Sequence, residues 1–90
     1  MLNDTKEILI NFKKARSLTD KLLNMTEEGE YCVDIMQQNL AAIGLLKSAH
    51  QMLLSRHLNT CFKNAMASKN EKLKTKMLDE ILKVNKLASK

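Results

Sequence analysis

The stretch from Glu30 to Ala67 places the strongest constraint on how this 90-residue chain can fold. It contains no proline and a single glycine, Gly44, so nothing in it forces a helix to end. As one helix it would be about 57 Å long, whereas a globule of this chain length has a radius of gyration of about 12 Å. Apolar side chains occur on almost every side, and one stripe consists of Val33, Met36, Leu40 and Ile43. Because an all-round apolar helix must be covered, we expect a second copy of the chain to cover it.

A shorter helix is predicted before this stretch, from Asp4 to about Met25. Asp4 or Asn3 can cap it, with Glu7 as the capping-box partner. The apolar spacing predicts a buried stripe made of Ile8, Phe12, Ala15, Thr19 and Leu22.

The segments on either side of the central helix read as turns. Thr26 to Glu30 contains Gly29, which permits a chain reversal. After Ala67, the residues Ser68 to Glu71 have the Ser-x-x-Glu form of a capping box, which predicts a third helix. Its predicted apolar stripe consists of Leu73, Met77, Ile81, Val84 and Ala88. The chain is therefore predicted to be all-α, a single domain over residues 1–90, with three helices that dimerise antiparallel into a helical bundle.

Three potential metal ligands lie in the central stretch: Cys32, His57 and Cys61. His57 and Cys61 are four residues apart and share one helical face, whereas Cys32 is about 37 Å from His57 along a continuous helix. Two antiparallel copies gather all three if Cys32 of one chain lies opposite His57 and Cys61 of the other. The two-fold axis would then pass near Gly44, where close backbone approach would offset the cost of about 1 kcal/mol of a glycine inside a helix. A chance glycine in a stable helix is the alternative.

Two thiolates and one imidazole form a soft ligand set, which favours Cu(I), while Zn(II) would require a fourth ligand. The alternative is that these residues only pack, since free cysteine is often buried. His50 lies on roughly the same face and is either a peripheral ligand or a polar rim residue. No Gly-rich loop or strand-turn-helix is present to build an oxyanion hole around a Cys–His pair, so we expect no enzyme.

The charge balance allows a polyanionic partner. The net charge is +5 and the isoelectric point is about 9.4. Lys13, Lys14, Arg16 and Lys21 are either phosphate contacts or an ordinary solvated face. The sequence has no apolar run that could span a membrane and no signal peptide, so we expect a cytoplasmic protein with reduced thiols.

These motifs resemble the copper-sensing operon repressor (CsoR) family. The resemblance rests on Tyr31-Cys32-Val-Asp-Ile, on Gln38 and on His57-Leu-x-x-Cys61, with the family's spacing of the three ligands. It implies a three-helix antiparallel dimer that usually doubles to a homotetramer. It also implies that Cu(I) binds to Cys32 of one protomer and to His57 and Cys61 of the other. Tyr31 resembles a family residue that supports the ligands without binding metal, and Asp79 or Glu80 of the last helix is similar to a second such residue.

The first helix departs from the family pattern. Family repressors carry Arg-x-Arg-Arg-Ile-x-Gly-Gln, where this chain has the residues from Asn11 to Leu18, with two lysines and one arginine and with Ser17-Leu18 in place of Gly-Gln. A further basic position of the family falls on Ile43. Lysine neutralises phosphate but lacks the planar fork of arginine, so we expect a DNA-binding surface that is weaker than the family pattern implies.

The sequence thus predicts a Cu(I)-sensing transcriptional repressor whose affinity for operator DNA is weakened by copper. The alternative is a cytosolic Cu(I)-binding or thiol-sensing helical protein that has lost DNA binding. A persulfide sensor is disfavoured, because a dithiol switch does not need His57.

Overall fold

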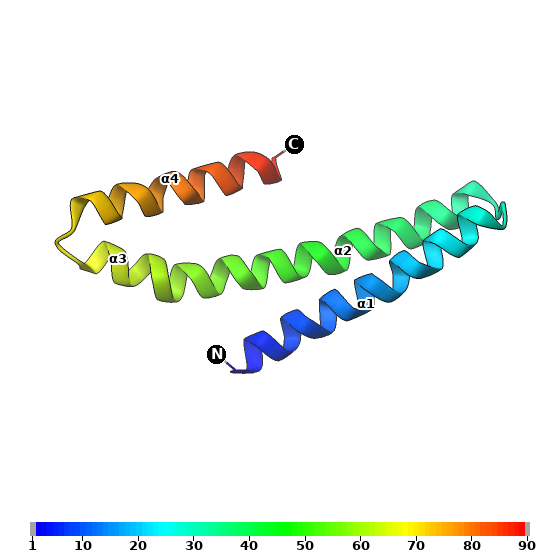
Figure 1. Cartoon of the computed structure of the whole chain (residues 1–90), viewed down its shortest axis with the longest axis horizontal. Coiled ribbons are helices and arrows are strands. Elements are labelled where there is room, and N and C mark those ends of the chain that lie inside the picture. The colour runs from blue at the N-terminus through cyan, green and yellow to red at the C-terminus, as the bar shows by residue number, and fades with distance from the viewer. Residues whose placement is uncertain (1, 90) are drawn as a thin grey trace. The chain divides into compact units, whose positions relative to one another are not determined.

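The computed structural model describes the backbone of residues 2–89 and the side chains of residues 4–89 (Figure 1). Its elements are α1 (Leu2–Glu27), α2 (Cys32–His57), the π-helical turn η1 (Leu58–Phe62), α3 (Lys63–Ala67) and α4 (Glu71–Ala88). Because α2, η1 and α3 follow one another without a break, three helical segments result, and the central one is the longest. The all-α prediction is confirmed, and no strand occurs in the described residues. The chain divides into two compact units, residues 1–56 and residues 57–90.

Residues 1–56 form an antiparallel helical hairpin. Two hydrogen bonds join its arms at different heights: Asn11 Nδ2 donates to the Leu45 carbonyl oxygen at 3.3 Å, and an Arg56 guanidinium N–H donates to Thr5 Oγ1 at 2.9 Å. Figure 1 shows the two arms leaving the same turn. α1 begins earlier than predicted, so Asp4 lies inside its first turn instead of capping it. The predicted Asn3 cap lies outside the described side chains.

The buried stripe of α1 has alternating spacings of three and four residues, which is the pattern of a helix packed against a near-antiparallel neighbour. Its buried and half-buried members are Ile8, Asn11, Ala15, Leu18, Leu22 and Met25. The prediction was right for Ile8, Ala15 and Leu22. It was wrong for Phe12, which is 41% exposed, and for Thr19, which is exposed. The Thr19 hydroxyl donates to the Ala15 carbonyl oxygen at 2.8 Å and so stays on the helix surface.

The turn between α1 and α2 confirms the predicted chain reversal at Gly29, whose φ is +69°. The Glu30 amide donates to the Met25 carbonyl at 3.0 Å, and the Gly29 amide donates to the Thr26 carbonyl at 3.2 Å. These two bonds form a Schellman motif, which requires a left-handed residue just beyond the helix. The Tyr31 carbonyl then accepts bonds from the Asp34 and Ile35 amides and starts α2 at Cys32, two residues later than predicted.

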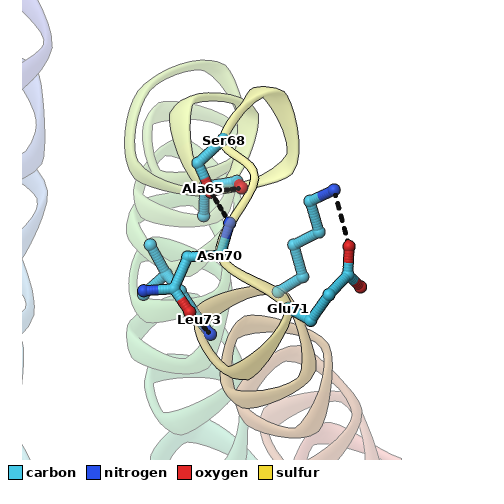
Figure 2. A network of polar contacts seen from close by, with 6 residues as sticks. Ala65, Ser68, Asn70, Glu71 and Leu73 are labelled. Atoms are coloured by element: carbon cyan, nitrogen blue, oxygen red, sulfur yellow. Dashed lines mark hydrogen bonds and ion pairs between the residues drawn. The ribbon is translucent and has the colours of Figure 1, made fainter.

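The junction between α3 and α4 corrects the predicted capping box (Figure 2). Asn70, not Ser68, caps α4: its side-chain oxygen accepts the Leu73 amide at 3.1 Å. The Ser68 hydroxyl instead donates to the Ala65 carbonyl at 2.7 Å and ends α3. Glu71 is not a capping-box partner but pairs with Lys74 at 3.3 Å.

The predicted α4 stripe is confirmed in part. Leu73, Met77 and Ile81 are half-buried, whereas Val84 and Ala88 are exposed. None of the described helices is long and apolar enough to cross a membrane.

One face of α2 leaves large apolar side chains uncovered within the chain. Its members are the predicted stripe Val33, Met36, Leu40 and Ile43, and Leu40 is 65% exposed. A small chain cannot bury every apolar residue, but a contiguous row of this kind on one helix marks an interaction surface.

Candidate metal centre and nucleic-acid surface

Cys32 is the first residue of α2, and its side chain is exposed. The local sequence explains this placement, because the Schellman turn and the two hydrogen bonds to the Tyr31 carbonyl fix where α2 starts. Tyr31 itself is 70% exposed. The thiol is not engaged in a disulfide and is therefore available as a soft ligand.

His57 and Cys61 lie next to each other at the junction of α2 and η1. His57 ends α2 with αR dihedrals and is half-buried, and Cys61 is an exposed residue of η1. In an α-helix a four-residue step passes a full turn by about 40°, a spacing that leaves two side chains on one helical face. The backbone spacing of His57 and Cys61 therefore remains compatible with a shared helical face.

The structure does not bring the three predicted ligands together within one chain. Among the described residues, no group of three or more His, Cys, Asp and Glu side chains could hold a metal ion. Cys32 and His57 are the first and last residues of α2, whose 26 residues span about 39 Å. The donor set nevertheless fits Cu(I) chemically, since both thiols are exposed and free and the third donor is an imidazole.

The two acidic candidates, Asp79 and Glu80, are both exposed residues of α4. Sequence reasoning missed one polar neighbour of a predicted ligand. The Thr60 hydroxyl donates to Cys61 Sγ at 3.8 Å. A hydroxyl residue directly before a cysteine is the sequence signal that could have found it.

The predicted basic residues of α1 are all exposed. Lys6 is also exposed and lies seven residues before Lys13, so it belongs to the same helical face as Lys13, Lys14 and Lys21. The seven-residue spacing from Lys6 to Lys13 was the signal in the sequence that could have identified Lys6, and sequence reasoning missed it. Arg16 lies at the edge of this face.

A shallow groove of about 460 Å³ lies beside this basic face. Lys13, Lys14, Ser17, Leu18 and Leu45 line it. Ser17 and Leu18 are the two residues that replace the Gly-Gln pair of the family pattern. The departure from that pattern therefore falls on the lining of a groove that Lys13 and Lys14 also line.

Comparisons with known proteins place these features in a family. The model of the metal-sensitive transcriptional repressor family matches residues 4–86. The copper-sensing transcriptional repressor CsoR of Mycobacterium ulcerans (strain Agy99) is 39% identical over 66 residues, covering 72% of this chain and 56% of the relative. The repressors of the same name from Mycobacterium bovis (strain BCG / Pasteur 1173P2) and Mycobacterium tuberculosis (strain F11) are 38% identical over 58 residues, covering 64% of this chain and 49% of each relative.

The chain spans about half the length of these curated relatives. A comparison with solved structures finds no match. The family match covers α2, the π-helical turn and α3 completely, most of α1 and α4, and every predicted ligand, and it confirms the resemblance seen in the sequence. The chain belongs to the metal-sensitive transcriptional repressor family.

Proposed function

We propose that this protein is a cytoplasmic Cu(I)-responsive transcriptional repressor and not an enzyme. Two antiparallel protomers would form the working unit, and two such dimers would form a tetramer. The proposal rests on one combined observation: the chain has a complete soft donor set, two free thiols and an imidazole, and it matches the family model over residues 4–86. The relatives named above are copper-sensing repressors, which supports copper over other metals.

The metal site would be shared between protomers. Cys32 and His57 are the first and last residues of the same helix and lie about 37 Å apart, so a single α2 cannot direct both at one ion. In an antiparallel pair, Cys32 of one protomer would join His57 and Cys61 of the partner subunit. The exposed α2 stripe from Val33 to Ile43 supports this pairing, because it supplies an apolar surface along the same helix.

Gly44 agrees with a two-fold axis near the middle of α2. A Cβ built on Gly44 meets nothing within 4 Å, so none of the residues that the structure describes requires a glycine there. Close approach of a second helix would supply that requirement, and it would offset the helix-propensity cost of about 1 kcal/mol.

DNA would bind to the exposed basic face of α1, which contains Lys6, Lys13, Lys14 and Lys21, with Arg16 at its edge. These side chains neutralise phosphates and release counterions, a term that carries no sequence information. Base discrimination needs bidentate donors, and this face offers a single arginine. We therefore expect a surface dominated by phosphate contacts.

Copper, when bound, would supply a soft acceptor that links thiolates of two protomers. Such linkage favours one arrangement of the dimer over others. If that arrangement presents the basic faces less well to a duplex, copper weakens DNA binding. By linkage, DNA then weakens copper binding by the same factor.

The shared site is tested by mixing two inactive variants. Cys32→Ala, and the double variant His57→Ala with Cys61→Ala, should each lose Cu(I) binding in a competition titration with a Cu(I) chelator. A mixture that exchanges subunits should recover copper sites, because each heterodimer carries one complete set of donors. His50→Ala should bind Cu(I) normally if His50 is a polar rim residue, and weaker binding would identify it as a peripheral ligand. No recovery despite demonstrated exchange would show that the site is not shared.

Repression is tested by fluorescence anisotropy with a duplex from the protein's own promoter region and a random duplex, with and without Cu(I). We expect binding to the promoter duplex that falls steeply with salt and decreases when Cu(I) is added. Binding that Cu(I) leaves unchanged would refute a copper-responsive repressor while leaving the copper site in place.

A further inference from the structure

The exposed methionine Met36 lies one helical turn after Cys32 on α2. Five methionines have described side chains. Met25 is buried, Met52, Met66 and Met77 are half-buried, and Met36 alone of these five is exposed, by 55%. The others pack within the chain as methionine usually does, whereas the Met36 thioether is accessible.

The helix directs Met36 toward Cys32. Residues four apart lie on one helical face, with their Cβ atoms about 5–6 Å apart. Long side chains of a helix point back toward its N-terminus and cover the preceding turn. From this geometry we expect the thioether of Met36 to lie over the turn that carries the Cys32 thiol. Two sulfur donors thus share one exposed patch at the start of α2.

The chemistry of this pair is specific. Thiolate and thioether are both soft ligands and select Cu(I) among biological metal ions. A thioether is neutral, so it adds a donor without adding negative charge. Zn(II) prefers thiolate, imidazole and carboxylate and gains little from it.

We propose that Met36 is a further copper ligand, which adds a thioether to the ion held by Cys32 and raises the preference for Cu(I) over Zn(II). This inference rests on the proposed function, because it takes the Cys32, His57 and Cys61 site as its starting point. It assigns to this chain a second sulfur donor on the Cys32 side of the site. Met36 would bind the ion directly and would not act through another residue.

Met36→Leu is the decisive variant. Leucine preserves the apolar volume, so packing of the α2 stripe against a second protomer is retained while the sulfur is lost. We expect Cu(I) affinity to fall about tenfold, equivalent to about 1.4 kcal/mol, with Zn(II) affinity unchanged. Met52→Leu is the matched control on the same helix and should change neither affinity. Equal loss of Cu(I) and Zn(II) binding by Met36→Leu would indicate a packing role and overturn the proposal.

X-ray absorption at the selenium edge gives a direct readout. In protein labelled with selenomethionine and loaded with Cu(I), we expect a copper neighbour at bonding distance from selenium. Met36→Leu should remove this signal, and Met52→Leu should keep it. Bound copper without a copper–selenium signal in the labelled protein overturns the role of Met36 and leaves the proposed function intact. Failure of the unsubstituted protein to bind Cu(I) would instead refute the proposed function.

Discussion

Replacing Leu40 by alanine should weaken the proposed dimer more than any other single truncation in the exposed stripe of α2. Leu40 is 65% exposed in the single chain, the largest fraction among Val33, Met36, Leu40 and Ile43. Alanine is the best helix former, so the substitution preserves α2 itself. The loss should therefore appear in association and not in folding of the hairpin.

The size of the effect follows from the exposed area. The substitution removes three carbon atoms, each worth about 0.8 kcal/mol when fully buried. Since 65% of the residue remains to be covered by a partner, the substitution weakens the free energy of dimerisation by about 1.6 kcal/mol per protomer. Each residue occurs twice in a two-fold interface, so the dimer loses about 3 kcal/mol of association free energy. The dimer dissociation constant should rise by about two orders of magnitude.

Sedimentation equilibrium over a range of protein concentrations measures this constant. Leu87→Ala is the matched control, because Leu87 is 60% exposed but belongs to α4 and is not a member of the α2 stripe. The control should leave the dimer dissociation constant unchanged. Cu(I) binding by Leu40→Ala should become dependent on protein concentration, because the shared site exists only in the dimer. An unchanged dissociation constant for Leu40→Ala would refute the assignment of this stripe to the dimer interface.

Four further predictions test other parts of the structure. Gly29→Ala should destabilise the hairpin by about 1–2 kcal/mol in urea unfolding, because φ is +69° there and a Cβ is strained in that region. Gly44→Ala should stabilise the α2 helix by up to about 1 kcal/mol, yet it should raise the dimer dissociation constant. An unchanged dimer dissociation constant would contradict a close helix approach at this residue. Asn70→Ala should cost about 1 kcal/mol of stability, while Asn70→Asp should retain the cap; equal losses would exclude the side-chain cap as the cause. Lys13→Ala with Lys14→Ala should lower the salt dependence of DNA binding by a slope of about 0.9 per lost phosphate contact, equally on both duplexes, and an unchanged slope would remove α1 from the DNA surface.

The sequence by itself determined the helical segments and the identity of the candidate ligands. The absence of proline, the glycine at the reversal and the spacing of apolar residues leave few alternatives to three helices with a long central one. The ligand set could be predicted for the same reason, since a spacing within a helix fixes which side chains share a face. The assignment of Cys32, His57 and Cys61 to one site stays a prediction, because it depends on a second chain.

Only the tertiary structure decided which of two neighbouring stripes on α1 is buried. Asn11 and Phe12 are adjacent, as are Leu18 and Thr19, so the spacing alone allows either set. Asn11 turns inward because its amide donates to the Leu45 carbonyl of the opposite helix, and the larger Phe12 stays outside. A contact between residues 34 positions apart in the chain cannot be predicted from a local pattern.

The ends of α3 and α4 show the same limit at shorter range. Ser68 and Asn70 are both good capping residues, and the sequence motif favoured Ser68. Both residues have extended backbones, and Asn70 is the cap because its side chain reaches the Leu73 amide, while the Ser68 hydroxyl is engaged with the Ala65 carbonyl. Likewise, no residue pattern in the sequence predicts the π-helical turn that contains Cys61. Side-chain types set the options for each helix end and turn, and the hydrogen bonds formed in the folded chain select among them.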